Sequence, residues 1–187
     1  MGVGPPRLLL NAFGSIAVLM VVAVIGIGLP ALDRAVAGDR PLPAGQPYRL
    51  GAGVSLMPPA GATLDAGRTR PGRDHATAVF HTGDVRLAVQ AARFDGRLPT
   101  AVNRLRTKLV LGAGCRVTGS EQPVHTAAGA PGIHGEYVLG HHAGQYAVYL
   151  AGGVAVEATV EGPPPELSAR LPAVQDSLAS LTIESQR

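Results

Sequence analysis

The sequence predicts an α+β fold in which an antiparallel β-sheet packs with two main helices, preceded by one amino-terminal transmembrane helix. Three patterns predict it: a 25-residue segment without charge, stretches in which apolar and polar residues alternate, and two stretches with apolar residues at helical spacing. The chain has 187 residues, of which 46% are hydrophobic. It can therefore form one core and is too apolar to be disordered.

Residues 8–32 form the predicted membrane segment, after a cytoplasmic amino terminus of residues 1–7. As a helix the segment would extend roughly 37 Å, more than the ~30 Å hydrocarbon core of a bilayer. Arg7 directly precedes it, which favours an amino terminus in the cytoplasm. The sequence A-V-A ending at Ala37 matches a signal-peptidase site, so cleavage before Gly38 and release of a secreted protein is the alternative.

The domain is expected to begin after an extended spacer. Residues 33–47 contain three prolines and no apolar periodicity, which predicts a semi-rigid extracytoplasmic spacer. The remaining residues, 48–187, are a normal length for one core. Alternating apolar positions and short turns at residues 82–84, 141–144 and 151–153 predict antiparallel strands at residues 77–81, 85–91, 133–139, 145–150 and 154–160.

Two stretches have helical spacing. The first follows Pro99 and ends at Gly112, a good helix stop, with its stripe at Val102, Leu105 and Leu109. In the second, Pro172 is expected to kink or restart the helix. Its apolar positions are Leu167, Leu171, Val174, Leu178 and Leu181. Helices covering the faces of an antiparallel sheet make an α+β sandwich.

The segment after the spacer carries a family resemblance. Residues 53–61 read G-V-S-L-M-P-P-A-G and resemble the opening strand of PsbP-like and LpqN-like domains, although Ala62 stands where that family usually has tryptophan. The V-x-x-S-L sequence that starts at Val174 is similar to the family's closing helix. The resemblance implies the same α+β fold, an extracytoplasmic address in a bacterial envelope of the actinobacterial type, and a binding or accessory role without catalytic residues.

Histidines are the candidate metal ligands. His134 lies on a predicted strand and His141 and His142 lie at a predicted hairpin tip. Adjacent residues of a strand point to opposite faces, so these side chains converge only if the turn reorients one of them, and the alternative is a solvated turn. The sequence has no G-x-S-x-G, G-x-G-x-x-G or H-E-x-x-H motif. We therefore expect no cofactor and no catalysis, with a small-ligand or metal-binding enzyme using the His-bearing loops as the alternative.

Charge is unevenly distributed along the chain. Residues 68–116 hold ten basic and three acidic side chains, whereas residues 117–187 hold two and seven. The basic residues on and before the first helix either face an anionic envelope component or acidic partner, or form the solvated face of a helix whose charges folding interleaves with the acidic half. They are Arg93, Arg97, Arg104, Arg106 and Lys108.

The expected partners follow from these patterns. A net charge of +3 and 4% aromatic residues exclude a dedicated nucleic-acid binder, which needs many phosphate contacts and stacking rings. The predicted partners are the lipid bilayer through residues 8–32 and an unidentified envelope protein or anionic envelope component. The predicted location is the cell membrane, with a single span and an extracytoplasmic carboxyl-terminal domain.

Overall fold

The computed structural model describes residues 38–43 and 45–184, so the membrane helix predicted at residues 8–32 lies outside the described residues. Within the described residues, no helix combines the length and hydropathy that crossing a bilayer requires. The described residues form an α+β fold with an eight-stranded antiparallel sheet, a three-stranded sheet and two helices. The predicted fold class of the domain is thus confirmed.

The large sheet has the strand order β1-β4-β5-β6-β10-β9-β8-β7, and every neighbouring pair in it is antiparallel. Its strands are β1 (Asp39–Pro41), β4 (Thr63–Asp65), β5 (His75–Thr82), β6 (Val85–Arg93), β7 (Arg116–His125), β8 (Pro131–Leu139), β9 (His142–Ala151) and β10 (Val154–Gly162). The small sheet has the order β11-β3-β2, with β2 (Tyr48–Gly51), β3 (Val54–Leu56) and β11 (Thr182–Ile183).

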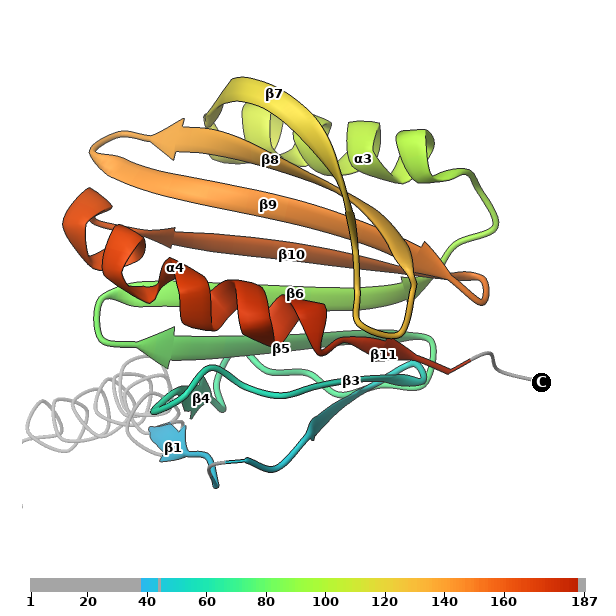
Figure 1. The fold of residues 1–187 in the computed structure, drawn as a ribbon, viewed down its shortest axis with the longest axis horizontal. Coiled ribbons are helices and arrows are strands. Elements are labelled where there is room, and N and C mark those ends of the chain that lie inside the picture. The colour runs from blue at the N-terminus through green and yellow to red at the C-terminus, as the bar shows by residue number, and fades with distance from the viewer. Residues whose placement is uncertain (1–37, 44, 185–187) are drawn as a thin grey trace, which may run out of the picture. The chain divides into compact units, whose positions relative to one another are not determined.

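The two helices pack on opposite faces of the large sheet. The helix α4 (Pro164–Ala179) crosses in front of β5, β6 and β10 in Figure 1, whereas α3 (Leu98–Thr107) lies behind the sheet near β7 and β8. A π-helical segment, Lys108–Gly112, continues α3. This segment ends at Gly112, the glycine that the sequence predicts as the helix stop. Because the helices lie on different faces, the sheet has two cores.

Strand β9 shows why both cores form. Ala147 and Tyr149 pack in the core under α4, and Tyr146 and Val148 pack in the core under α3. All four side chains are buried, because a strand covered on both faces has no solvated side. This is the reason that residues 146–150 form a continuous apolar stretch instead of alternating with polar residues.

Strands β8 and β9 are held together by glycine–tyrosine pairs in which the two residues stand directly opposite each other. The pairs are Gly132 with Tyr149, Gly135 with Tyr146, and Gly144 with Tyr137. A Cβ atom added at these three glycines would lie 2.5, 2.4 and 2.3 Å from the respective tyrosine ring. Each ring therefore covers a glycine of the neighbouring strand, which protects the backbone and leaves no room for a larger residue.

The structure differs from the prediction at several elements. Three residues of the expected spacer, Asp39–Pro41, form β1, which pairs with β4, so part of that segment belongs to the sheet. His142 belongs to β9, so the turn after β8 is shorter than predicted. Strand β7 was not predicted, because as an edge strand with mostly exposed side chains it shows no apolar alternation.

The terminal helix also differs in detail. Helix α4 continues through Pro172 without a break. Proline removes the hydrogen bond to the carbonyl of Ser168, but both residues are exposed, so water can hydrate that carbonyl. Leu181 lies beyond the helix and is fully buried between α4 and β11. Cys115, the single cysteine of the chain, is buried.

Candidate functional site

A cavity of about 220 Å³ lies between α4 and the face of the sheet formed by β8, β9 and β10. Its floor is formed by Ala147 of β9 and Ala158 of β10, which stand directly opposite each other. Val174 and Leu178 of α4 line the opposite side. Two small residues at adjacent positions leave space below the helix that larger side chains would fill.

The hairpin between β7 and β8 reaches the end of α4 beside this cavity. The backbone N–H of Ala127, at the hairpin tip, donates to the carbonyl of Ala179, the last residue of α4, at 2.7 Å. Val124 and His125 of β7 contribute to the lining. In Figure 1 this hairpin curves down in front of the sheet toward the end of α4. The hydrogen bond therefore joins the hairpin to the helix at one end of the cavity.

His134 supplies a buried polar atom of the cavity. Its side chain lines the cavity from β8, opposite Ala147 of β9. The Nε2 atom is buried and has no hydrogen-bond partner among the described residues. An unpaired buried nitrogen of this kind lowers the stability of the fold by about 1–3 kcal/mol. A bound group that forms a hydrogen bond with it would remove this cost.

Further polar groups surround His134. The half-buried Gln145 and the exposed Gln175 line the cavity from β9 and α4, and Tyr149 lines it from the sheet. Burial raises the pKa of the Tyr149 hydroxyl, which therefore stays protonated at neutral pH. None of the lining residues is Asp, Glu, Lys or Arg. The cavity is thus mostly apolar, with hydrogen-bonding groups and no permanent charge.

The structure does not bring the three predicted metal-ligand candidates together. His141 lies in the turn between β8 and β9, and His142 pairs with Leu139. His134 lies five residues before Leu139 on β8, which separates the two histidines by roughly 16 Å along the strand. Among the described residues, no three His, Cys, Asp or Glu side chains are grouped so that they could hold a metal ion.

The basic residues singled out from the sequence mostly pair with carboxylates. Lys108 Nζ lies 2.5 Å and Arg104 Nε 4.0 Å from the carboxylate of Glu157 on β10. Arg106 Nε lies 3.5 Å from Glu121 of β7. These carboxylates come from the acidic half of the chain, so folding interleaves the two halves along α3.

Two of the five basic residues lie before α3 begins. Arg93 Nε lies 2.7 Å from Asp74. Arg97, at the start of α3, is exposed and forms no ion pair with any described residue. The five cations and the three carboxylates that pair with four of them, Asp74, Glu121 and Glu157, sum to a charge of +2. This group of residues is therefore much less basic than the sequence alone indicates.

The end of α3 carries exposed apolar side chains next to these charges. Val110 is 43% and Leu111 is 81% exposed, and they are the exposed large hydrophobic residues among those that the structure describes. Both belong to the π-helical segment that follows α3.

We expect the substitution Glu157→Gln to destabilise the domain by about 1 kcal/mol, because it removes the shared acceptor of Lys108 and Arg104. The cations are half exposed, so the loss should shrink at high salt. Urea unfolding at low and high ionic strength measures it. Glu136→Gln, at an exposed carboxylate without an ion pair among the described residues, is the matched control. An equal loss in both variants would contradict the role of the pairs.

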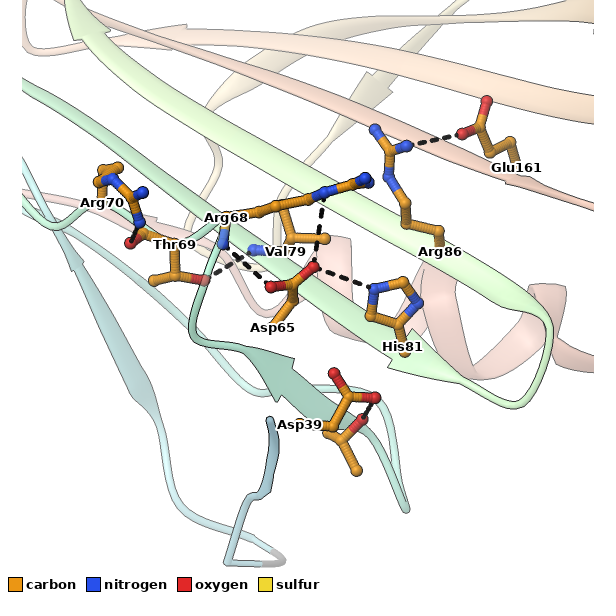
Figure 2. A network of polar contacts seen from close by, with 10 residues as sticks. Asp39, Asp65, Arg68, Thr69, Arg70, Val79, His81, Arg86 and Glu161 are labelled. Atoms are coloured by element: carbon orange, nitrogen blue, oxygen red, sulfur yellow. Dashed lines mark hydrogen bonds and ion pairs between the residues drawn. The ribbon is translucent and has the colours of Figure 1, made fainter. Parts of the chain in front are cut away.

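A second polar cluster lies at the other end of the sheet and is shown in Figure 2. Asp65 accepts a 2.9 Å hydrogen bond from the backbone N–H of Arg68 and lies 3.5 Å from His81 Nε2. Thr63 donates to Asp39 at 3.0 Å, which ties β1 to β4. Each of these contacts joins neighbouring chain segments, so we assign this cluster to the support of the sheet edge.

Sequence reasoning missed the cavity, although part of its signal is present. The sequence indicates His134 as a candidate metal ligand and Ala158 as an apolar position of a strand, and it does not indicate that either lines a cavity. Both strands contain further small residues, such as Ala143 and Ala155, so composition does not single out Ala147 and Ala158. Their juxtaposition depends on the register between β9 and β10, which the sequence alone does not supply.

Comparison with known proteins gives support for the fold only. No family model matches the chain, and no curated protein matches it by sequence. Among solved structures it is similar to the cyanobacterial PsbP protein CyanoP from Synechocystis sp., with a TM-score of 0.56 at 12% identity, over 74% of this chain and 92% of that one. It is also similar to the Ran-binding protein Mog1p of Saccharomyces cerevisiae, with a TM-score of 0.50 at 11% identity, over 74% and 95%. The domain thus has a PsbP-like fold.

Proposed function

We propose that this chain is a non-catalytic binding or accessory module of the bacterial cell envelope, anchored by a single membrane span at residues 8–32 with its domain on the extracytoplasmic side. The observation that carries the proposal is the 25-residue segment without charge. Exposing such a segment to water is energetically unfavourable, whereas the hydrocarbon core of a bilayer can accommodate it. We include in the proposal the LpqN-like, actinobacterial assignment, which rests on the family resemblance of residues 53–61.

The start of the fold limits how far the domain can stand from the membrane. Strand β1 begins at Asp39, only seven residues after Leu32. Even fully extended, seven residues reach about 25 Å. A module on so short a tether is suited to partners at or near the same membrane surface, such as an envelope protein or an anionic envelope component.

The solved relatives of the fold are compatible with a binding role. The yeast protein Mog1p is described as Ran-binding, which is one instance of this fold acting as a binding protein. We carry over only that a partner can dock on its surface. For this chain we favour the end of α3 as the docking site. The exposed Leu111 lies there, in the segment that also contains Lys108, and the Nζ atom of Lys108 forms an ion pair with Glu157.

The topology can be tested with single cysteines, because the one native cysteine, Cys115, is buried. In a Cys115→Ala background, we expect Ala128→Cys, at the exposed tip of the β7–β8 hairpin, to react with a membrane-impermeant maleimide in intact cells. Gly4→Cys should react only after lysis. Labelling of Gly4→Cys in intact cells, or of Ala128→Cys only after lysis, would overturn the proposal.

The secreted alternative is tested separately. If the A-V-A sequence directs cleavage, the mature amino terminus is Gly38 and the domain is found in the medium. If residues 8–32 remain as an anchor, the membrane fraction retains a chain of 19.1 kDa after alkaline extraction.

A further inference from the structure

The volume of the cavity under α4 indicates the size of ligand that it could hold. Its volume of about 220 Å³ compares with ~150 Å³ for an engineered protein cavity that binds benzene. The remaining ~70 Å³ exceeds the share of two water molecules, at ~30 Å³ each. A single ring with one small polar substituent therefore matches the space.

The polar side chains that line the cavity determine which polar substituent on the ligand ring it would favour. The unpaired Nε2 of His134 can donate a hydrogen bond when that nitrogen carries the proton, and the side-chain amides of Gln145 and Gln175 can donate as well. No carboxylate lines the cavity, so an ammonium group would enter without a counter-charge.

We propose that this cavity is a binding site for a compact monocyclic carboxylate, with its ring between α4 and the Ala147–Ala158 floor and its carboxylate accepting a hydrogen bond from His134 Nε2. The apolar walls supply most of the affinity and His134 supplies the selection for an acceptor. The site does not depend on where the domain is anchored, so it goes beyond the proposed envelope role. It gives the module a small-molecule ligand in addition to a surface partner.

The test uses the full chain with ¹⁵N-labelled histidine in lipid nanodiscs and benzoate as the probe. The chain has six histidines, so the ring signals of His134 can be assigned by their loss in His134→Ala. We expect benzoate to shift the His134 signals saturably, with a dissociation constant on the order of 1 mM or tighter. Benzyl alcohol should bind more weakly and benzylamine weakest. Failure of benzoate to saturate the shift, or equal binding of benzylamine, would overturn the proposal.

Variants separate binding in the cavity from binding elsewhere. Ala147→Met fills the floor and should weaken benzoate binding by at least about tenfold. If this buried change prevents folding, Gln175→Trp serves instead, because Gln175 is exposed at the cavity and a large side chain there blocks entry. Ser168→Trp, exposed on α4 but outside the lining, and His141→Ala, in the exposed turn, are the matched controls and should bind as the natural chain does. Undiminished binding in the two cavity variants would overturn the site.

The two proposals fail in distinguishable ways. Benzoate binding is read from the His134 ring, whereas topology is read from cysteine labelling in cells. Loss of the saturable shift with correct labelling would remove only the ligand site. Inverted labelling with an intact shift would remove only the envelope role.

Discussion

Replacing Gly51 by alanine should cost the domain about 3–5 kcal/mol of unfolding free energy, a large part of the ~5–15 kcal/mol that a domain of this kind has. Gly51 ends β2 with a φ of +112°, a conformation that alanine rarely adopts. A Cβ atom there would also lie 2.2 Å from the backbone oxygen of Gly72. Backbone strain and a backbone collision therefore add.

The position of Gly51 explains why the chain cannot simply move aside. Gly51 and Gly72 form an isolated β-bridge, and the N–H of the next residue, Ala52, donates to the Gly72 carbonyl at 2.9 Å. The flanking Leu50 and Ala52 are buried in the core under α4. Separating the two backbones would break the hydrogen bond and open that core.

Gly61→Ala is the matched control for this substitution. Gly61 also has a positive φ, +72°, but no atom lies within 4 Å of a Cβ atom built on it. It should lose only about 1–2 kcal/mol, the cost of a left-handed conformation for a residue with a side chain. Urea unfolding followed by tyrosine fluorescence measures both variants. If the two losses were equal, the contact with Gly72 would have no energetic role.

The elements that the sequence predicted are those that pack on a core. The strands at β5, β6, β8, β9 and β10 and both helices were recognised, because their apolar side chains recur with the period of the element. Strand β7 was missed, since its side chains are largely exposed and it is held by backbone pairing with β8. β1, β4 and β11 have two or three residues each, too few for any period to show.

The site was less accessible to sequence reasoning than the fold. The five basic residues near α3 are close together in the sequence, but the net charge around them depends on Glu121 and Glu157, which are distant in the chain and close in the fold. The cavity likewise depends on a pairing register and on the path of α4 across the sheet. Periodicity reports which face of an element is buried and does not report which side chains meet across elements.

Alkaline pH should unfold the domain because its tyrosines are buried. Burial raises the pKa of all four, Tyr48, Tyr137, Tyr146 and Tyr149, and for Tyr137 and Tyr146 nearby Glu161 and Glu121 add to the effect. In the unfolded chain tyrosine titrates near pH 10. Below that pH both states keep their protons, and above it the unfolded state releases protons that the folded state retains, so stability falls as pH rises.

The size of this effect follows from proton counting. Each tyrosine that is protonated only in the folded state lowers the unfolding free energy by about 1.4 kcal/mol per pH unit, so four such tyrosines would lower it by at most about 5.6 kcal/mol per unit. This is a large fraction of the ~5–15 kcal/mol that a domain has, so we expect the domain to unfold in strongly alkaline solution. No tyrosine occurs in residues 1–37, so tyrosinate absorbance reports on the domain alone.

The slope of stability against pH separates this mechanism from general alkaline damage. Urea unfolding of the natural chain at several pH values above 10 should show stability falling as pH rises, and Tyr137→Phe should give a shallower slope, whatever its stability at neutral pH. The variant keeps the packing of an aromatic ring on Gly144, because the phenylalanine ring covers this glycine as the tyrosine ring does. Tyrosinate formation near pH 10 with unchanged near-ultraviolet circular dichroism would show that the rings ionise in the folded state, and the buried glycine–tyrosine pairs would then not be the source of alkaline sensitivity.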